Sequence, residues 1–308
     1  MLDRVGTLSI SQGMITEYGR IQSRTVKLQM QISSGKVGDN LADVKDKASV
    51  LVAAKQRAAG VASFLSTTKE VNTRLDMQDV HLQQLTDVTA RLRTAVGNAL
   101  SSGRAGPLME EVRGLYAEAV GVLNYRMNGN YLYGGTRTDV SPVSATDLSA
   151  LAAAPNVASV FRNTDQAMMV NIDQSESLTV GITASDVATD LFQMFKDIAD
   201  FNIGANGPLN AALTPAQVSF LTNANVQIPG IQGGVAEIAA LNGTRHEQVE
   251  RAIERHEAMS AYFAKFIGDI EDVDLAEAVA RLNRDQVAAE ASGRMIAQLS
   301  ETNLLKYL

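Results

Sequence analysis

The sequence contains no cysteine and no tryptophan, and aromatic residues account for only 5% of its 308 positions. Without cysteine the chain can form no disulfide, no thiolate zinc site and no cysteine nucleophile. A low aromatic content suits helices that pack closely side by side better than it suits a thick globular core. The composition therefore favours a helical protein that depends on neither disulfides nor thiol chemistry.

Positive charge and long apolar runs are also scarce. The formal net charge is −7 and the isoelectric point is about 5.1, with basic residues scattered among acids, so we expect no binding to nucleic acid or to an anionic membrane. No run approaches the roughly 18 to 20 apolar residues of a membrane span, so no membrane insertion is expected. The N-terminus lacks the continuous apolar segment of a Sec signal peptide. Taken alone, these features indicate a cytoplasmic protein, unless export uses a signal of a different kind.

The longest pattern in the chain runs from Val61 to Ala99. Mostly apolar residues recur there at alternating spacings of three and four, which is typical of a helix packed lengthwise against other helices. Extended over 46–101, this helix would be about 80 Å long, whereas a compact globule of this chain length is about 50 Å across. The sequence therefore predicts an elongated rod. The polar seam positions expected to set its register against a second long helix, at 214–270, are Thr68, Gln78 and Thr89.

Other segments carry the same helical spacing, and Gly35 is expected to end the first of them. Thr214 and Gln217 have the spacing of a capping box, and Pro229 is expected to interrupt or kink the helix that follows. The further predicted helices lie at 5–33, from 108 to about 122, from about 185 onward, at 214–270 and at 275–308. Three short β-like runs lie between them, at 157–161, 168–172 and 178–183.

These elements predict a mainly α fold. We expect a rod of long antiparallel helices resembling a coiled-coil bundle, with a small β insert at its tip and with the N- and C-terminal helices paired. The predicted domains are a terminal helical domain formed by 1–42, linker included, and 272–308; a helical rod formed by 43–138 and 185–271; and a β-rich insert at 139–184.

The most enzyme-like string is HEQVE at 246–250, because zinc protease helices use H-E-x-x-H. The second histidine of that pattern is replaced by Glu250, and the next histidine, His256, lies about 15 Å further along a helix, too far to share a metal with His246. Gly134 and Gly135 do not belong to a phosphate-binding loop sequence. With no convergent acid and base set, we expect no enzymatic activity, no cofactor and no metal site.

Neither terminal helix can bury its apolar stripe alone, and a pair of such helices buries only a narrow stripe of each. We therefore expect the ends to be poorly ordered in the free subunit and to become ordered on assembly. The residues expected to bind partners are the apolar seam positions of the two terminal helices: Met14, Tyr18, Ile21, Leu28, Ile32, Leu275, Val279, Leu282, Ile296, Leu299 and Leu305.

Three motifs make the chain resemble the bacterial flagellin superfamily, and most closely its hook-associated proteins of the hook-filament junction. They are QISSGK at 31–36, NGNYLYGGTRTDVSPV at 128–143 and the C-terminus, which ends in LLKYL. The chain departs from the pattern in lacking a paired-acid element after the first motif, where only Asp43 and Asp46 stand, in carrying Tyr133 in place of Phe, and in its short insert. The motif residues that carry the resemblance are Ser33, Ser34, Gly35, Asn128, Gly129, Tyr131, Tyr133, Gly134 and Gly135.

The resemblance implies a structural adaptor between the hook and the filament, located outside the cell on the flagellum. It also implies export through the flagellar type III apparatus, helped by an export chaperone, which accounts for a secreted protein without a Sec signal. The implied partners are other copies of the chain, the hook-side junction protein and flagellin. Two alternatives stay open: a filament-forming flagellin of the same superfamily, and an intracellular coiled-coil scaffold.

Overall fold

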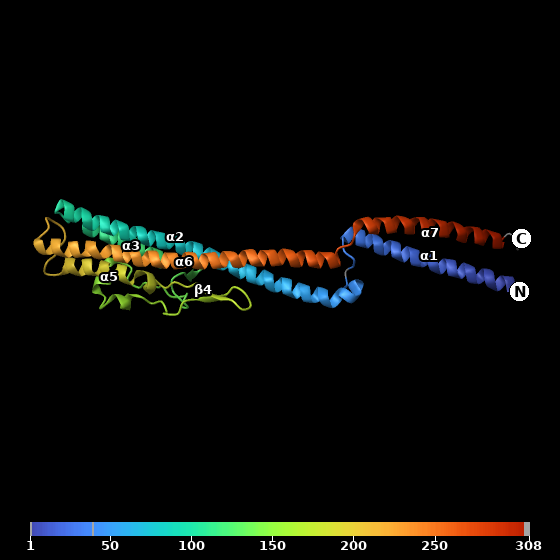
Figure 1. Cartoon of the computed structure of the whole chain (residues 1–308), viewed down its shortest axis with the longest axis horizontal. Helices are drawn as coiled ribbons and strands as arrows, with labels where there is room; N and C mark the ends of the chain where they lie inside the picture. Colours follow the sequence, from blue (N-terminus) through green and yellow to red (C-terminus); the bar gives the residue numbers. More distant parts are fainter. Residues whose placement is uncertain (1, 39, 305–308) are drawn as a thin grey trace. The chain divides into compact units, whose positions relative to one another are not determined.

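The computed structural model describes residues 2–38 and 40–304 and is mainly helical (Figure 1). Its long helices pack antiparallel, and a segment between helices in the sequence forms small two-stranded sheets. This confirms the predicted fold class. Contacts divide the chain into two units, residues 62–257 and residues 1–61 together with 258–308. Among the described residues, no helix is long and apolar enough to cross a membrane.

The unit of residues 62–257 is built on the two longest helices, α2 (Ala48–Ser102) and α6 (Pro215–Glu271). They run antiparallel, because α6 residues of increasing number contact α2 residues of decreasing number, from Asn242 against Leu75 to Glu257 against Lys69. The shorter helices α3 (Leu108–Leu123) and α5 (Ala184–Ile203) complete the core with them. The alternating spacings of three and four between apolar residues (4-3 spacing) therefore predicted the bounds of the two long helices closely.

Helix starts follow the local chemistry of the sequence. The predicted capping box of α6 is confirmed: Gln217 N–H donates to Thr214 Oγ1 at 3.3 Å, and Thr214 N–H donates to Gln217 Oε1 at 3.1 Å. Thr183 and Asp186 make the same reciprocal pair at the start of α5. Pro229 does not interrupt α6, which continues through it.

The residues that align α2 with α6 differ from those predicted from the sequence. Thr68 and Thr89 are buried, but each hydroxyl donates to a carbonyl of its own helix, four residues earlier. The cross-helix bond instead comes from α6, where Asn242 Nδ2 donates to Leu75 O at 3.1 Å. The expectation that the polar α2 positions bond across the seam was wrong for both threonines, because a threonine in a helix can satisfy its hydroxyl locally.

The segment between α3 and α5 holds two hairpins and two short helical turns. Strands β1 (Arg126–Met127) and β2 (Asn130–Tyr131) pair antiparallel across a turn at 128–129, as do β3 (Met169–Asn171) and β4 (Ser177–Thr179). The helix α4 (Leu148–Ala153) and the 3-10 turn η2 (Val157–Val160) lie between the hairpins.

The predicted strand at 157–161 is therefore wrong. Asn156 caps η2 by accepting a hydrogen bond from Ser159 N–H at 2.9 Å, and the turn buries Val157 and Val160 on the same side. Only Phe161 pairs in a strand-like way, through a single bridge to Val143. Two valines three residues apart fit a buried turn as well as a strand, so the pattern alone could not separate the two structures.

The β3–β4 hairpin lies along the side of α2 and α6 within this unit, not at the end of the bundle (Figure 1). Val180, just after β4, packs with Val71 of α2 and Val249 of α6 in a small apolar cluster. Arg255 of α6 also pairs with Glu176 in the hairpin turn at 2.8 Å. The predicted tip position is corrected accordingly, because Val180 is buried against the two long helices and Arg255 of α6 pairs with the hairpin turn.

The second unit contains the two terminal helices, α1 (Leu2–Ser34) and α7 (Leu275–Leu304), with the 3-10 helix η1 (Leu41–Lys47) and the adjoining ends of α2 and α6. α1 and α7 pack against each other along their length, as predicted (Figure 1). α1 ends where expected, with Gly35 at φ +73°, a conformation that ends helices and strongly favours glycine.

Candidate assembly surface

The seam between α1 and α7 is narrow. Along α1, the side chains shielded from solvent recur at alternating spacings of four and three, and those between them are exposed. Of the described side chains in the two helices, only Ile21 and Ala278 are fully buried. A pair held by so little buried apolar area gains limited stability from its own contacts, since burial contributes only about 25 cal/mol per Å².

Most of the predicted partner-binding residues line this seam. Those shielded at the α1–α7 seam are Met14, Tyr18, Ile21, Leu28 and Ile32 on α1, with Leu282 and Ile296 on α7. Leu275 and Val279 lie differently, since their side chains are 52% and 43% exposed. The side chain of Leu299 and the whole of Leu305 lie outside the described part of the structure.

The course of the seam on α7 explains the exposure of Leu275 and Val279. Ala278 faces α1 and is followed by Leu282 four residues later and Asp285 three residues after that. Leu275 and Val279 lie on the neighbouring face of the helix. A small alanine gives a weak signal in a hydrophobic pattern, so the larger residues on either side of it were expected in the seam.

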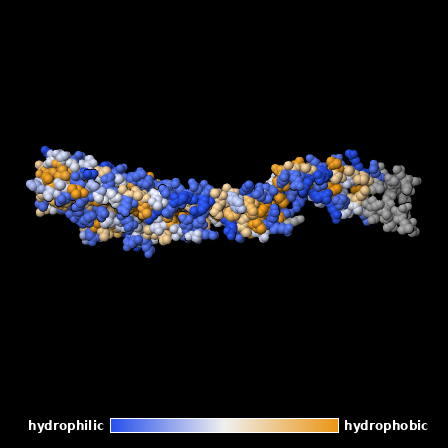
Figure 2. Space-filling model, in the orientation of Figure 1, coloured by the Kyte–Doolittle hydropathy of each residue, from blue (hydrophilic) through white to orange (hydrophobic). Residues whose placement is uncertain are grey.

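A second set of apolar residues faces solvent on both terminal helices. On α1 these side chains share one face, about a third of a turn away from the seam. The prediction from the sequence did not include them, because it considered only apolar residues with the spacing of the seam. Apolar residues off the seam were nevertheless visible in the sequence. They are Ile15, Val26 and Met30 on α1, with Val287 and Met295 on α7. Figure 2 shows hydrophobic surface interspersed with hydrophilic surface on this unit.

Charged residues border the seam. Arg24 of α1 donates to the carboxylate of Asp285 on α7 at 3.3 Å, and the same guanidinium lies 3.6 Å from Glu17. The hydrogen bond with Asp285 raises the pKa of Arg24. Both ion pairs are open to water, so they contribute more to the alignment of the helices than to their stability.

The first motif, at 31–36, ends at a short backbone bridge between two linkers of this unit, the one that follows α1 and the one that precedes α7. We call this bridge the clasp. Val37 N–H donates to Glu271 O at 2.7 Å, and Val273 N–H donates to Gly35 O at 3.0 Å, which makes a short antiparallel bridge. The Lys36 ammonium lies between the carboxylates of Glu271 and Asp272, and its bond with Asp272 raises its pKa. Ser33 and Ser34 form the exposed last turn of α1. The motif therefore joins the two chain segments that connect the terminal helices to α2 and α6.

The second motif, at 128–143, lies in the other unit and is buried at 132–135 and 142–143. Asn128 and Gly129, both at positive φ, make the turn between β1 and β2, and the Tyr131 ring lies 4.3 Å from the Arg126 guanidinium. Tyr133 is fully buried. The backbone is tight at the next two residues, since a Cβ on Gly134 would overlap Arg137 O and one on Gly135 would lie 2.6 Å from Thr164 Oγ1. This motif packs the insert onto the bundle.

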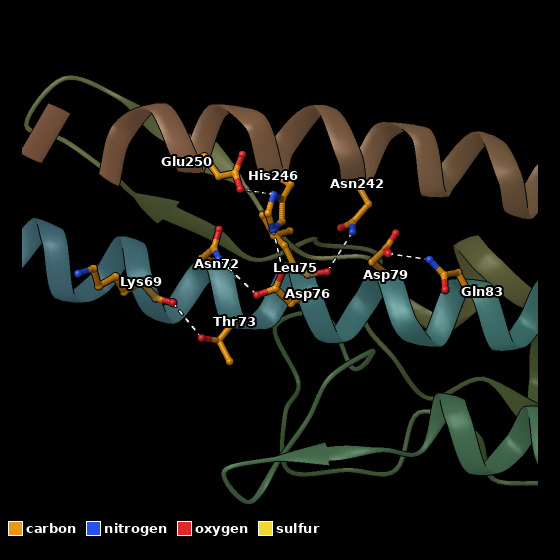
Figure 3. Close-up of polar contacts among 10 residues, drawn as sticks. All are labelled: Lys69, Asn72, Thr73, Leu75, Asp76, Asp79, Gln83, Asn242, His246 and Glu250. Carbon is orange, nitrogen blue, oxygen red and sulfur yellow. Dashed lines mark hydrogen bonds and ion pairs between the residues drawn. The ribbon is translucent and has the colours of Figure 1, made fainter. Parts of the chain in front are cut away.

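The histidines of the enzyme-like string have structural partners. His246 Nε2 lies 2.7 Å from Asp76 of α2, and its Nδ1 lies 3.5 Å from Glu250 (Figure 3). His256 is buried, where it stacks on Phe64 and its Nε2 bonds to Ile172 O at 2.8 Å. Within residues 2–38 and 40–304, no group of three or more His, Cys, Asp or Glu side chains could hold a metal ion.

The chain is similar to known proteins in its C-terminal sequence and in its fold. Residues 231–308 match the family described as the bacterial flagellin C-terminal helical region. A protein of Vibrio parahaemolyticus described as flagellar hook-associated has a similar structure, with a TM-score of 0.61 and 16% identity over 75% of this chain and 100% of that one. FlgL of Bacillus cereus is also similar, with a TM-score of 0.54 and 10% identity over 70% of this chain and 98% of that one. A comparison with curated sequences gave no match.

At these identities the two structures establish a shared fold and no more. The C-terminal match adds sequence similarity over α7 and over residues 231–271 of α6. The chain therefore shares its C-terminal region with bacterial flagellins and its fold with the two flagellar proteins above.

Proposed function

We propose that this protein is a structural adaptor that joins the hook of the bacterial flagellum to the filament. The observation that carries the proposal is the combination of a flagellin-type C-terminal region with the fold of hook-associated proteins. The LLKYL end and the motif at 128–143 favour the junction over the filament, because both resemble junction proteins.

In this proposal the terminal helices supply the contacts. Their shared seam leaves apolar side chains such as Val26 and Leu275 facing outward, where neighbouring subunits can cover them. The partners are other copies of the chain, the hook-side junction protein and flagellin. Delivery runs through the flagellar type III apparatus with an export chaperone, and the terminal helices become fully ordered on assembly.

Deletion of the gene tests the proposal. Hooks should stay intact while flagellin is exported but released into the medium, since nothing would anchor the filament. Complementation with the intact gene should restore attached filaments. Filaments that remain attached in the deletion strain would refute the junction role.

A filament-forming flagellin is the second candidate, because the matched family is that of flagellin itself. The two roles differ in self-assembly. A junction adaptor should stay monomeric when purified and exposed to salting-out conditions, whereas a flagellin should polymerise into long filaments under the same conditions.

A further inference from the structure

The unit of residues 62–257 buries a positive charge that no acid neutralises. Arg74 of α2 is only 8% exposed, and none of the ion pairs found among the described residues includes it. Its Nη2 donates to Leu132 O at 2.6 Å, and its Nε has no hydrogen-bond partner. A guanidinium stays charged at neutral pH, so one backbone carbonyl leaves most of this buried charge uncompensated.

The acids nearest to Arg74 in the sequence are occupied elsewhere. Asp76 bonds to His246 on α6, and Asp79 accepts a hydrogen bond from Gln83 on its own helix at 2.9 Å (Figure 3). Asp76 and Asp79 lie two and five residues after Arg74, which places both on a different face of α2. Among the residues that the structure describes, no carboxylate forms an ion pair with Arg74.

Two more polar side chains share the face of α2 that carries Arg74. Gln78 follows one turn later and is fully buried, and neither its Nε2 nor its Oε1 has a hydrogen-bond partner. His81 follows after a further three residues, and its buried Nδ1 also lacks a partner. Unpaired polar atoms inside a protein are costly, and several of them together indicate a bound species that satisfies them.

Tyr133 faces this group from the second motif. Its ring lies 5.9 Å from that of His81, and Arg74 Nη2 donates to the carbonyl of Leu132, the residue directly before Tyr133. Burial raises the pKa of Tyr133 well above its usual value, so the phenol stays protonated and can donate a hydrogen bond. Its hydroxyl too has no partner.

We propose that Arg74, Gln78 and Tyr133 bind a small monovalent inorganic anion, of the size of chloride, between α2 and the second motif. The unpaired Arg74 Nε, Gln78 Nε2 and Tyr133 hydroxyl are all able to donate hydrogen bonds to it. A monovalent ion matches the single positive charge, and the near-complete burial of these side chains favours a small ion. The anion fastens the second motif to α2.

Bromide, which replaces chloride and scatters anomalously, tests the site directly. Crystals of the full chain grown in sodium bromide should show an anomalous peak within hydrogen-bond distance of Arg74 Nε and the Tyr133 hydroxyl. A non-anomalous peak at that position, as water would give, or no peak at all, would overturn the proposal. This measurement needs no variant and is independent of the flagellar role.

Thermal unfolding supplies the second test. The melting temperature should rise with the logarithm of chloride concentration more steeply than in sodium glutamate at the same ionic strength, because an ion bound only by the folded state stabilises it. Arg74→Met should abolish this difference, and Tyr133→Phe should reduce it. Arg91→Met, which removes an exposed arginine of the same helix, is the matched control and should keep the difference. An equal chloride effect in Arg74→Met and Arg91→Met would contradict the proposal.

Discussion

Single residues determine how the long helices align. Apolar positions along α2 and α6 would allow the helices to slide by a turn, because one leucine layer resembles the next. Asn242 limits this freedom, since its amide reaches the backbone of α2 at one point only, Leu75 O. A buried polar residue in an apolar seam is a known means of fixing register.

Asn242→Ala should lower the free energy of unfolding by about 1 to 3 kcal/mol, because it removes a buried hydrogen bond and leaves a small cavity. Asn223→Ala, at an exposed position of the same helix, should change it by less than about 0.5 kcal/mol. Chemical denaturation of both variants measures the difference. Equal effects would show that Asn242 has no special part in the seam.

His81 should make stability depend on pH. Burial lowers the pKa of its imidazole below the ordinary value of 6.5, so the unfolded chain takes up a proton more readily than the folded one. The stability of the folded state should therefore fall as the pH falls through about 6.5, and level off below the folded-state pKa. Denaturant melts of the wild type and of His81→Phe between pH 5 and 8 check this. The variant should show a weaker loss on acidification, and an unchanged pH profile would contradict the role of His81.

Gly135 of the second motif is irreplaceable for two reasons. Its φ is +67°, and a Cβ there would lie 2.6 Å from Thr164 Oγ1 and 2.8 Å from Gln166 O. Gly135→Ala should therefore destabilise the protein by about 1 to 3 kcal/mol. Gly121→Ala in α3 has open space around it and should be neutral or stabilising by up to about 1 kcal/mol. If thermal melts rank the two variants the other way, the tight backbone at Gly135 is not needed.

At the scale of elements, the sequence predicted the long helices well and the short elements poorly. α2, α6, α1 and α7 carry many turns of 4-3 spacing, and each added turn strengthens the signal. The strands have two or three residues each, too few for an alternating pattern to be recognised. The β1–β2 hairpin was missed for this reason.

The candidate surface was predictable only in part. The pairing of α1 with α7 followed from their spacing, but the seam phase of α7 depends on Ala278, whose small side chain hardly contributes to a hydrophobic pattern. The clasp between the linkers depends on backbone hydrogen bonds of Gly35 and Val37, which no side-chain pattern reports. Contacts between residues far apart in the sequence needed the structure.

The two faces of α1 should respond differently to a charge. Ile21 is 4% exposed in the seam, so Ile21→Asp should disrupt the α1–α7 pair and lower the helical content measured by circular dichroism. Val26 is 52% exposed, so Val26→Asp should leave the helical content unchanged but prevent attachment of filaments in a complemented deletion strain. Arg20→Asp, at an exposed position of the same helix away from both sets, should preserve folding and attachment. Normal attachment by Val26→Asp would show that this face makes no contact.

At the scale of the whole molecule, the two units differ in how completely they bury their apolar side chains. Residues 62–257 bury a large apolar core, and a second, small apolar cluster packs the insert against α2 and α6. The terminal helices share a narrow seam and expose apolar side chains on their remaining faces. This difference supports an adaptor that folds around one unit and assembles through the other.

The position of the protein on the flagellum tests the central claim most directly. Gold-labelled antibodies against the chain, imaged by electron microscopy on intact flagella, should mark a single site where the hook meets the filament. Label distributed along the filament, or absent from the flagellum altogether, would contradict the junction role.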